Sequence, residues 1–227
     1  MSYELEQARG TPFAADIVTL YHGSQKVIKK PQYGAGNPFN DYGLGFYTTK
    51  DKELAGEWAV LNSGKDGRIN EYKLDYNALS VLRLDSQPFE VGVAVLMLCR
   101  RGEYANEVQS RLDRFIEKYG IDISSYDVIE GWRANDSFFS YVRDFAAMAL
   151  SLEKLKEAMR LGGLGTQVCL KTQMAFNQLE WLTTSAALAS RFYSSAKSRD
   201  EEARKAYRDM KEKTKGTLIF DLIGRDY

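Results

Sequence analysis

The sequence of 227 residues contains only two cysteines and one histidine. Two cysteines, Cys99 and Cys169, cannot build a disulfide framework or a four-cysteine zinc site. A single histidine likewise excludes a multi-histidine metal centre. We therefore predict no metal site, and His22 is the one imidazole that can take part in binding or catalysis.

The chain also lacks an excess of charge of either sign, because 31 Lys and Arg balance 31 Asp and Glu. A balanced chain is not typical of proteins that bind nucleic acids or membranes through their overall charge. The longest apolar run, residues 91–99, is too short for a membrane helix, which needs about 20 residues. The polar N-terminus does not have the character of a signal peptide. We expect a cytoplasmic protein with no membrane partner.

What the chain does contain is an ordinary globular composition, with 44% apolar and 27% charged residues. Hydrophobic periodicity predicts strands in six short segments, at residues 17–21, 46–49, 68–74, 79–84, 126–129 and 166–170. It predicts helices at residues 52–61, 89–100, 105–119, 137–150, 152–161 and 174–193. Residues 29–45 are rich in glycine and proline and are predicted to form a loop. This order of elements indicates an α+β fold.

The C-terminal segment has a different character. Ser198 and Glu201 have the spacing of a capping box, which predicts a charged helix that begins there and runs to about residue 213. The final run, residues 217–223, is expected to add an edge strand or to cover the core. We therefore divide the chain into a main domain, residues 1–195, and an appended charged helix with a C-terminal strand, residues 196–227.

Three segments stand out as candidates for a functional site. His22 and Gly23 end the first predicted strand and are followed by Ser24. Gly43 to Tyr47 (GLGFY) form a glycine-flanked turn into the second strand, and Trp58 follows Tyr47 by eleven residues on the next predicted helix. A third glycine turn leads into the strand that contains Gln167.

In this order the three segments resemble the His-Tyr-Glu signature of the ADP-ribosyltransferase superfamily, in the branch of diphtheria toxin and the poly(ADP-ribose) polymerases. The similarity covers roughly residues 17–185 and is closest to a poorly characterised bacterial family. The resemblance implies a split β-sandwich around an NAD cleft, with flanking helices. It also implies that NAD is the substrate.

The resemblance assigns roles residue by residue. His22 would hydrogen-bond the adenosine-ribose hydroxyls of NAD, and the backbone N–H and C=O of Gly23 would bind the nicotinamide carboxamide. Tyr47 and Trp58 would stack on the nicotinamide ring. The expected NAD-binding residues are thus His22, Gly23, Ser24, Tyr47 and Trp58. From the same motif, a side chain at Gly23 is expected to block NAD while leaving the fold intact.

The third position departs from the family, since Gln167 stands where the family has a glutamate. A glutamine can hydrogen-bond the nicotinamide ribose, but it cannot act as a base or supply charge to a cationic transition state. The expected catalytic residues are Gln167, His22 and Tyr47, with transfer of a single ADP-ribose. On charge alone, Gln167→Glu is expected to raise turnover.

The resemblance therefore implies an NAD-dependent mono-ADP-ribosyltransferase, a glycosyl-transferring enzyme that acts on a protein or nucleic-acid acceptor. A role as a toxin or antiphage effector, with a neutralising partner protein, follows only by association with bacterial relatives. Two alternatives stay open. One is a non-catalytic module that binds NAD or ADP-ribose, and the other is an NAD glycohydrolase, in which water is the acceptor.

Overall fold

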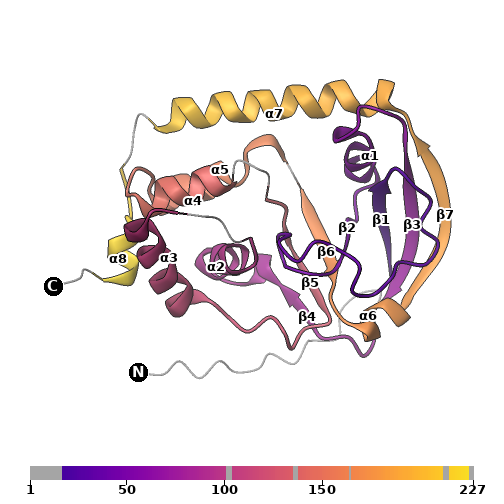
Figure 1. Ribbon diagram of the computed structural model, residues 1–227, viewed down its shortest axis with the longest axis horizontal. Helices are drawn as coiled ribbons and strands as arrows, with labels where there is room; N and C mark the ends of the chain where they lie inside the picture. The colour runs from indigo at the N-terminus through magenta and orange to yellow at the C-terminus, as the bar shows by residue number, and fades with distance from the viewer. Residues whose placement is uncertain (1–16, 101–103, 135–137, 164, 212–214, 225–227) are drawn as a thin grey trace.

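The protein is an α+β structure built on two β-sheets (Figure 1). The computed structural model describes residues 17–100, 104–134, 138–163, 165–211 and 215–224. The first sheet has the strand order β1-β3-β7, with β1 at Ile17–Ser24, β3 at Gly67–Asp75 and β7 at Leu179–Ala187. The second has the order β2-β6-β5-β4, with strands at Phe46–Thr48, Thr166–Leu170, Val128–Trp132 and Val81–Arg83.

All neighbouring strands are antiparallel except β4 and β5. The two sheets pack against each other through an apolar cluster that includes Leu20 and Tyr72 of the first sheet and Phe46 and Val168 of the second. They are also linked directly where Tyr21 and Thr49 exchange two backbone hydrogen bonds of 2.8 and 2.9 Å. The sheets are therefore joined at this corner, next to His22.

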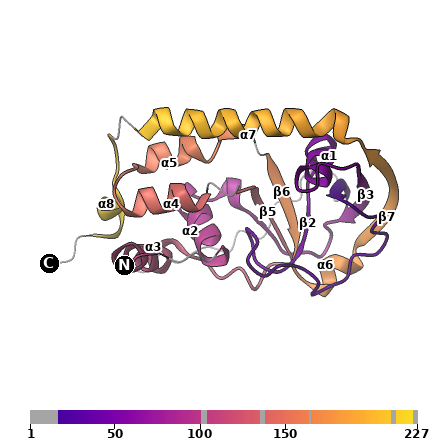
Figure 2. The same cartoon turned by 45° about the horizontal axis from the view of Figure 1, so that its top comes forward.

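Most of the helices lie on one side of the molecule. The short α6 lies at Gln173–Asn177, between β6 and β7. Four helices and the C-terminal α8 lie on the side of the second sheet, with α2 at Phe89–Cys99, α3 at Asn106–Tyr119, α4 at Phe138–Ala146, α5 at Leu152–Ala158 and α8 at Ile219–Ile223. They share the largest core cluster with that sheet. The longest helix, α7 (Ala189–Lys211), crosses from the first sheet to these helices (Figures 1 and 2). Along the described residues, no helix is both long and apolar enough to cross a bilayer.

Most of the predicted elements are confirmed, and the loop at residues 29–45 contains no helix or strand along its length, all of which is described. The helix predicted at 174–193 is wrong, because α6 ends at Asn177 and is followed by β7. Trp181, Thr183 and Thr184 are aromatic and β-branched residues that favour a strand. Strand β7 covers the second edge of β3, from Leu74 paired with Leu179 to Gly67 paired with Ala187. This pairing outweighs the local apolar pattern that suggested a helix.

The C-terminal predictions also need correction. Ser198 does not begin a helix, because α7 starts at Ala189 and the Ser198 hydroxyl instead bonds Glu202 at 3.2 Å, one turn further along. The expected domain boundary at residue 195 thus lies inside α7. The final segment forms the helix α8 rather than an edge strand, and it covers the core through the fully buried Ile219.

Helix α1 (Lys52–Leu61) packs closely on β1 at Gly23. The side chain of Asp51 caps the helix by accepting hydrogen bonds from the backbone N–H groups of Glu53 and Leu54, at 2.8 and 3.2 Å. A Cβ atom added to Gly23 would lie 1.8 Å from the backbone oxygen of Ala55. The expectation that a side chain at Gly23 leaves the fold intact is therefore wrong, because the substituent would meet the helix.

This packing predicts that Gly23→Ala destabilises the protein by about 3 kcal/mol, the upper end of the usual cost of overpacking. Gly34→Ala is the matched control, since Gly34 has a φ of 77° but no atom within 4 Å of the added Cβ. It should cost only about 1 kcal/mol, from the strain of its backbone conformation. The measurement is urea denaturation of both variants, and equal losses would contradict the proposed contact.

Candidate functional site

A cleft of about 840 Å³ opens beside the corner where the two sheets meet. Its size falls within the range of about 300–1,000 Å³ that is usual for cofactor and substrate pockets. His22, Tyr47, Trp58 and Gln167 all line it. The structure therefore brings together four predicted site residues that come from β1, β2, α1 and β6.

The other two predicted residues lie differently. Gly23 and Ser24 are not among the described residues that line the cleft. The Ser24 hydroxyl donates to the backbone oxygen of Lys26 at 2.7 Å and accepts from the amide of the buried Asn70 at 3.2 Å. Ser24 therefore shapes the turn after β1 rather than facing the cleft.

Gly23 retains a route to a ligand through its backbone. Tyr21 directs its N–H and C=O toward Thr49, away from β3. The backbone groups of successive residues in a strand point to opposite edges, so Gly23, two residues after Tyr21, directs its own N–H and C=O to the same side as Tyr21. That side is the open edge of β1, beyond the point where the bridge to Thr49 ends.

His22 is fixed in one tautomer by the neighbouring strand. Its Nδ1 atom lies 2.6 Å from the backbone oxygen of Tyr47. A carbonyl oxygen only accepts, so Nδ1 carries the proton, and Nε2 is left with a lone pair. Burial lowers the pKa of His22 below its ordinary value of 6.5, which keeps the ring neutral near pH 7. His22 therefore offers a hydrogen-bond acceptor to the cleft.

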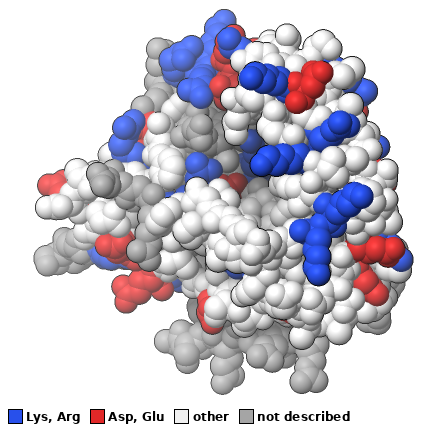
Figure 3. All heavy atoms as spheres, turned by 45° about the vertical axis from the view of Figure 1, so that its right-hand side comes forward, with Lys and Arg blue, Asp and Glu red and all other residues white. Residues whose placement is uncertain are grey.

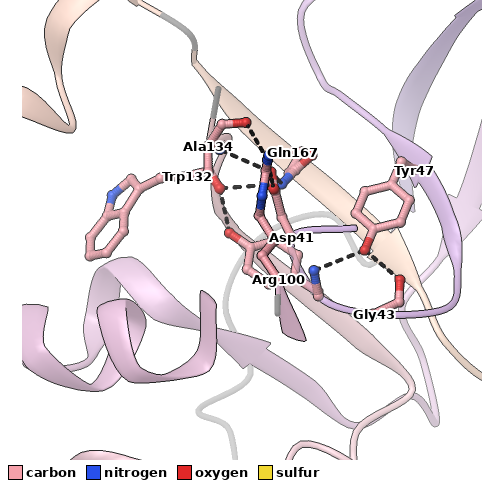
Figure 4. Close-up of polar contacts among 8 residues, drawn as sticks. Asp41, Gly43, Tyr47, Arg100, Trp132, Ala134 and Gln167 are labelled. Atoms are coloured by element: carbon pink, nitrogen blue, oxygen red, sulfur yellow. Dashed lines mark hydrogen bonds and ion pairs between the residues drawn. The ribbon is translucent and has the colours of Figure 1, made fainter. Parts of the chain in front are cut away.

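The glycine turn before β2 holds the Tyr47 ring by its hydroxyl group. This hydroxyl donates to the backbone oxygen of Gly43 at 2.7 Å and accepts from the backbone N–H of Tyr42 at 2.9 Å (Figure 4). Gly43 has a φ of 75°, a left-handed conformation that favours glycine. Burial raises the pKa of Tyr47 far above its ordinary value. Tyr47 is thus a neutral, fixed aromatic wall and not a base.

Trp58 also lines the cleft, but part of its surface is occupied. The Arg133 guanidinium lies 5.2 Å from the centre of a Trp58 ring, which is the geometry of a cation–π contact. Arg133 lines the same cleft. The Arg133 guanidinium therefore covers part of the Trp58 indole, and a ligand ring would have to stack on the part of the indole that Arg133 leaves uncovered.

Gln167 is almost completely buried and belongs to a cluster that the sequence did not predict. Its Nε2 atom donates to Oδ2 of Asp41 at 2.6 Å and to the backbone oxygen of Trp132 at 3.3 Å (Figure 4). Both partners only accept hydrogen bonds, so a flipped amide would place its oxygen against two acceptors. The Oε1 atom must therefore point away from Asp41.

Asp41 is the centre of this cluster. The Arg100 guanidinium donates to its Oδ1 at 2.7 Å, and the backbone N–H of Ala134 donates to its Oδ2 at 2.9 Å. We refer to Asp41, Arg100, Ala134 and Gln167 as the Asp41 cluster, and all four line the cleft. Three donors thus occupy the Asp41 carboxylate, one on Oδ1 and two on Oδ2.

Sequence reasoning missed Asp41 and Arg100 for different reasons. Asp41 lies two residues before Gly43, the start of the glycine turn, and an acidic residue so close to the predicted site was a signal that could have been used. Arg100 is 59 residues away at the end of α2, and no spacing rule links the two.

Cys169 lies in β6 close to Tyr47, and burial raises the pKa of this thiol to about 12. It is an unreactive core residue.

The fold and the cleft together define an α+β protein with two sheets and a pocket large enough for a nucleotide-sized ligand. The chain belongs to the family described as a protein family of unknown function, DUF3990, whose model matches residues 18–181. No curated protein and no solved structure shows a significant match. The matched segment includes every predicted site residue but ends before α7.

The Asp41 cluster predicts that Gln167→Glu destabilises the protein at neutral pH. The new carboxylate would face Asp41 and the Trp132 carbonyl, so we expect a loss of about 3 kcal/mol or more from an uncompensated buried charge. This repulsion would raise the pKa of the new glutamate in the folded state above its unfolded value of about 4.3. The penalty is therefore present at pH 7.5 and shrinks as the pH falls toward 5.

The measurement is the thermal midpoint of the wild type, Gln167→Glu and Gln167→Met between pH 5 and pH 7.5. Gln167→Met removes the same hydrogen bonds without adding a charge, so its deficit should change much less with pH. A Gln167→Glu variant whose deficit does not depend on pH would show that residue 167 and Asp41 do not face each other.

Proposed function

We propose that the protein is an NAD-dependent mono-ADP-ribosyltransferase with an ADP-ribosyltransferase-like split β-sandwich. The observation that carries the proposal is the meeting of His22, Tyr47, Trp58 and Gln167 in one cleft. The resemblance assigned these residues to one NAD site on sequence order alone. Two sheets joined at the corner beside that cleft suit the expected fold.

The chemistry of the cleft residues suits the proposed roles. Nε2 of His22 can accept a hydrogen bond from a ribose hydroxyl of NAD. The open edge of β1 at Gly23 offers one donor and one acceptor, which is what a carboxamide requires. Tyr47 and Trp58 supply apolar aromatic surface for the nicotinamide ring.

Gln167 acts in this proposal as an oriented acceptor. In the transfer reaction the bond between ribose C1′ and the nicotinamide nitrogen breaks, its electron pair leaves with nicotinamide, and the acceptor atom bonds C1′ and releases a proton. The Oε1 dipole of Gln167, held by Asp41 and Trp132, can accept a hydrogen bond from the ribose 2′-hydroxyl and face the growing positive charge. The acceptor's proton has to pass to solvent or to a group on the acceptor, because Gln167 is not a base.

The acceptor is a macromolecule in this proposal, and a toxin or antiphage role in the cytoplasm of a bacterium is the setting that the resemblance suggests. A NAD glycohydrolase and a non-catalytic NAD- or ADP-ribose-binding module would use the same cleft. The buried Gln167 supports the non-catalytic binding module in particular, because an amide lacks the charge of the glutamate in the superfamily that the chain resembles.

We predict that His22→Ala weakens NAD binding by about 5- to 150-fold, the loss of one well-placed hydrogen bond worth about 1–3 kcal/mol. Because the binding form of His22 is neutral and its pKa is lowered, wild-type affinity should be constant above pH 6.5 and fall at more acidic pH. The affinity of His22→Ala should not change over that range. Isothermal titration calorimetry with NAD tests both points, and equal affinities for the two proteins would rule out the assignment of His22.

We further predict that Gln167→Ala slows nicotinamide release by about 10²–10³-fold, the usual value of one fixed polar group at a transition state. Gln167→Glu should not exceed the wild-type rate, because its carboxylate would be repelled by Asp41. This reverses the expectation from charge alone. The measurement is single-turnover nicotinamide release at pH 7.5.

Incubation with NAD labelled in the adenosine part, together with a cell extract, separates the three candidate functions. Label on macromolecules identifies a transferase, free ADP-ribose identifies a glycohydrolase, and neither product despite measurable binding identifies a binding module. Equal nicotinamide release by the wild type, Gln167→Ala and Gln167→Glu would place Gln167 outside the site.

A further inference from the structure

Helix α7 forms a wall of the cleft although it lies beyond the segment that matches the family. Six of its residues line the cleft, namely Ala196, Lys197, Arg199, Asp200, Ala203 and Arg204. Figures 1 and 2 show the helix running from the end of β7, past α1, to α4 and α5. The composition of this wall is therefore a property of the chain that the family match does not describe.

The position of α7 is fixed at both ends. Phe192 packs against α1 at Gly56, where an added Cβ would lie 2.5 Å from the Phe192 ring. Arg199 forms an ion pair with Glu57 of α1. At the other end the Tyr207 hydroxyl donates to the buried Asp144 at 2.7 Å. The side chains that α7 presents to the cleft are thus held over it.

The acidic residues that line the cleft are already neutralised. Asp41 pairs with Arg100 at 2.7 Å, and Asp200 pairs with Arg204 at 2.8 Å. Glu57 is the partner of Arg199. Lys197, by contrast, makes no ion pair or hydrogen bond with any residue that the structure describes, although it lines the same cleft. Figure 3 shows Lys and Arg side chains gathered around a depression in the surface.

We propose that Lys197 on α7 binds a phosphate group of the ligand in the cleft. This inference rests on the proposed function for the identity of the ligand, since NAD carries a diphosphate with two negative charges. The residues assigned to NAD are all uncharged at neutral pH: His22, Tyr47, Trp58 and Gln167. The diphosphate therefore needs a cation from another part of the cleft, and Lys197 offers three N–H donors and a full charge without breaking an existing ion pair.

The test compares Lys197→Met with Lys205→Met, a matched substitution of an exposed lysine on the same helix that does not line the cleft. Calorimetry measures the affinity of each variant for NAD, ADP and adenosine. Lys197→Met should weaken the binding of NAD and ADP by about tenfold or more, whereas Lys205→Met should leave both unchanged. Binding of adenosine, which has no phosphate, should be the same in all proteins.

Further measurements separate a phosphate contact from a structural effect. Lys197→Arg keeps the charge and should restore most of the affinity, and the effect of Lys197→Met should diminish at high salt. Unchanged affinity of Lys197→Met for NAD and ADP overturns the inference. A loss that is equal for ADP and adenosine does so as well.

The inference and the proposed function fail in different ways. If the wild type binds ADP with a dependence on Lys197 but does not bind NAD, the phosphate site stands and the NAD-dependent function is wrong. If the wild type binds NAD and Lys197→Met binds it equally well, the function stands and the phosphate site is wrong. If the wild type binds neither NAD nor ADP, both are overturned.

Discussion

The buried carboxylate of Asp41 is the interaction on which the cleft depends. A buried charge is costly unless it is paired and hydrogen-bonded, and Asp41 meets this requirement with donors from three distant parts of the chain. Arg100 ends α2, Ala134 follows β5, and Gln167 belongs to β6. The loop that carries Asp41 continues into the turn that holds Tyr47 by its hydroxyl group. One charge thus ties the helical side of the molecule to the aromatic wall of the cleft.

Asp41 also accounts for the presence of a glutamine, and not a glutamate, at residue 167. An amide has one donating and one accepting end, whereas a carboxylate only accepts. The position next to Asp41 requires a hydrogen-bond donor. The amide of Gln167 supplies this donor through Nε2 and keeps Oε1 as an acceptor that points away from Asp41. Charge alone leaves out Asp41, the neighbour of Gln167 that comes from a different segment of the chain.

The sequence was a good guide where local signals decide the structure. The helix at Lys52–Leu61 and the strand at Thr166–Leu170 were predicted with the boundaries observed, because capping, apolar spacing and flanking glycines agree there. The sequence misled where tertiary pairing decides, as in β7, whose residues pair along β3. It was silent on the Asp41 cluster, since ion pairs across 59 residues have no sequence pattern. Four of the residues that the resemblance grouped, His22, Tyr47, Trp58 and Gln167, line one cleft in the structure.

The rigid crossing of α7 means that the two walls of the cleft are specified by separate parts of the chain. An α-helix rises about 1.5 Å per residue, so the number of residues between the contacts at Phe192 and Tyr207 fixes the distance that α7 spans along the cleft. Insertion or loss of a turn between the anchors would shift the wall by about 5.4 Å without altering any residue of the family segment. Proteins that share the Asp41 side of the cleft can therefore diverge in pocket width through this single helix.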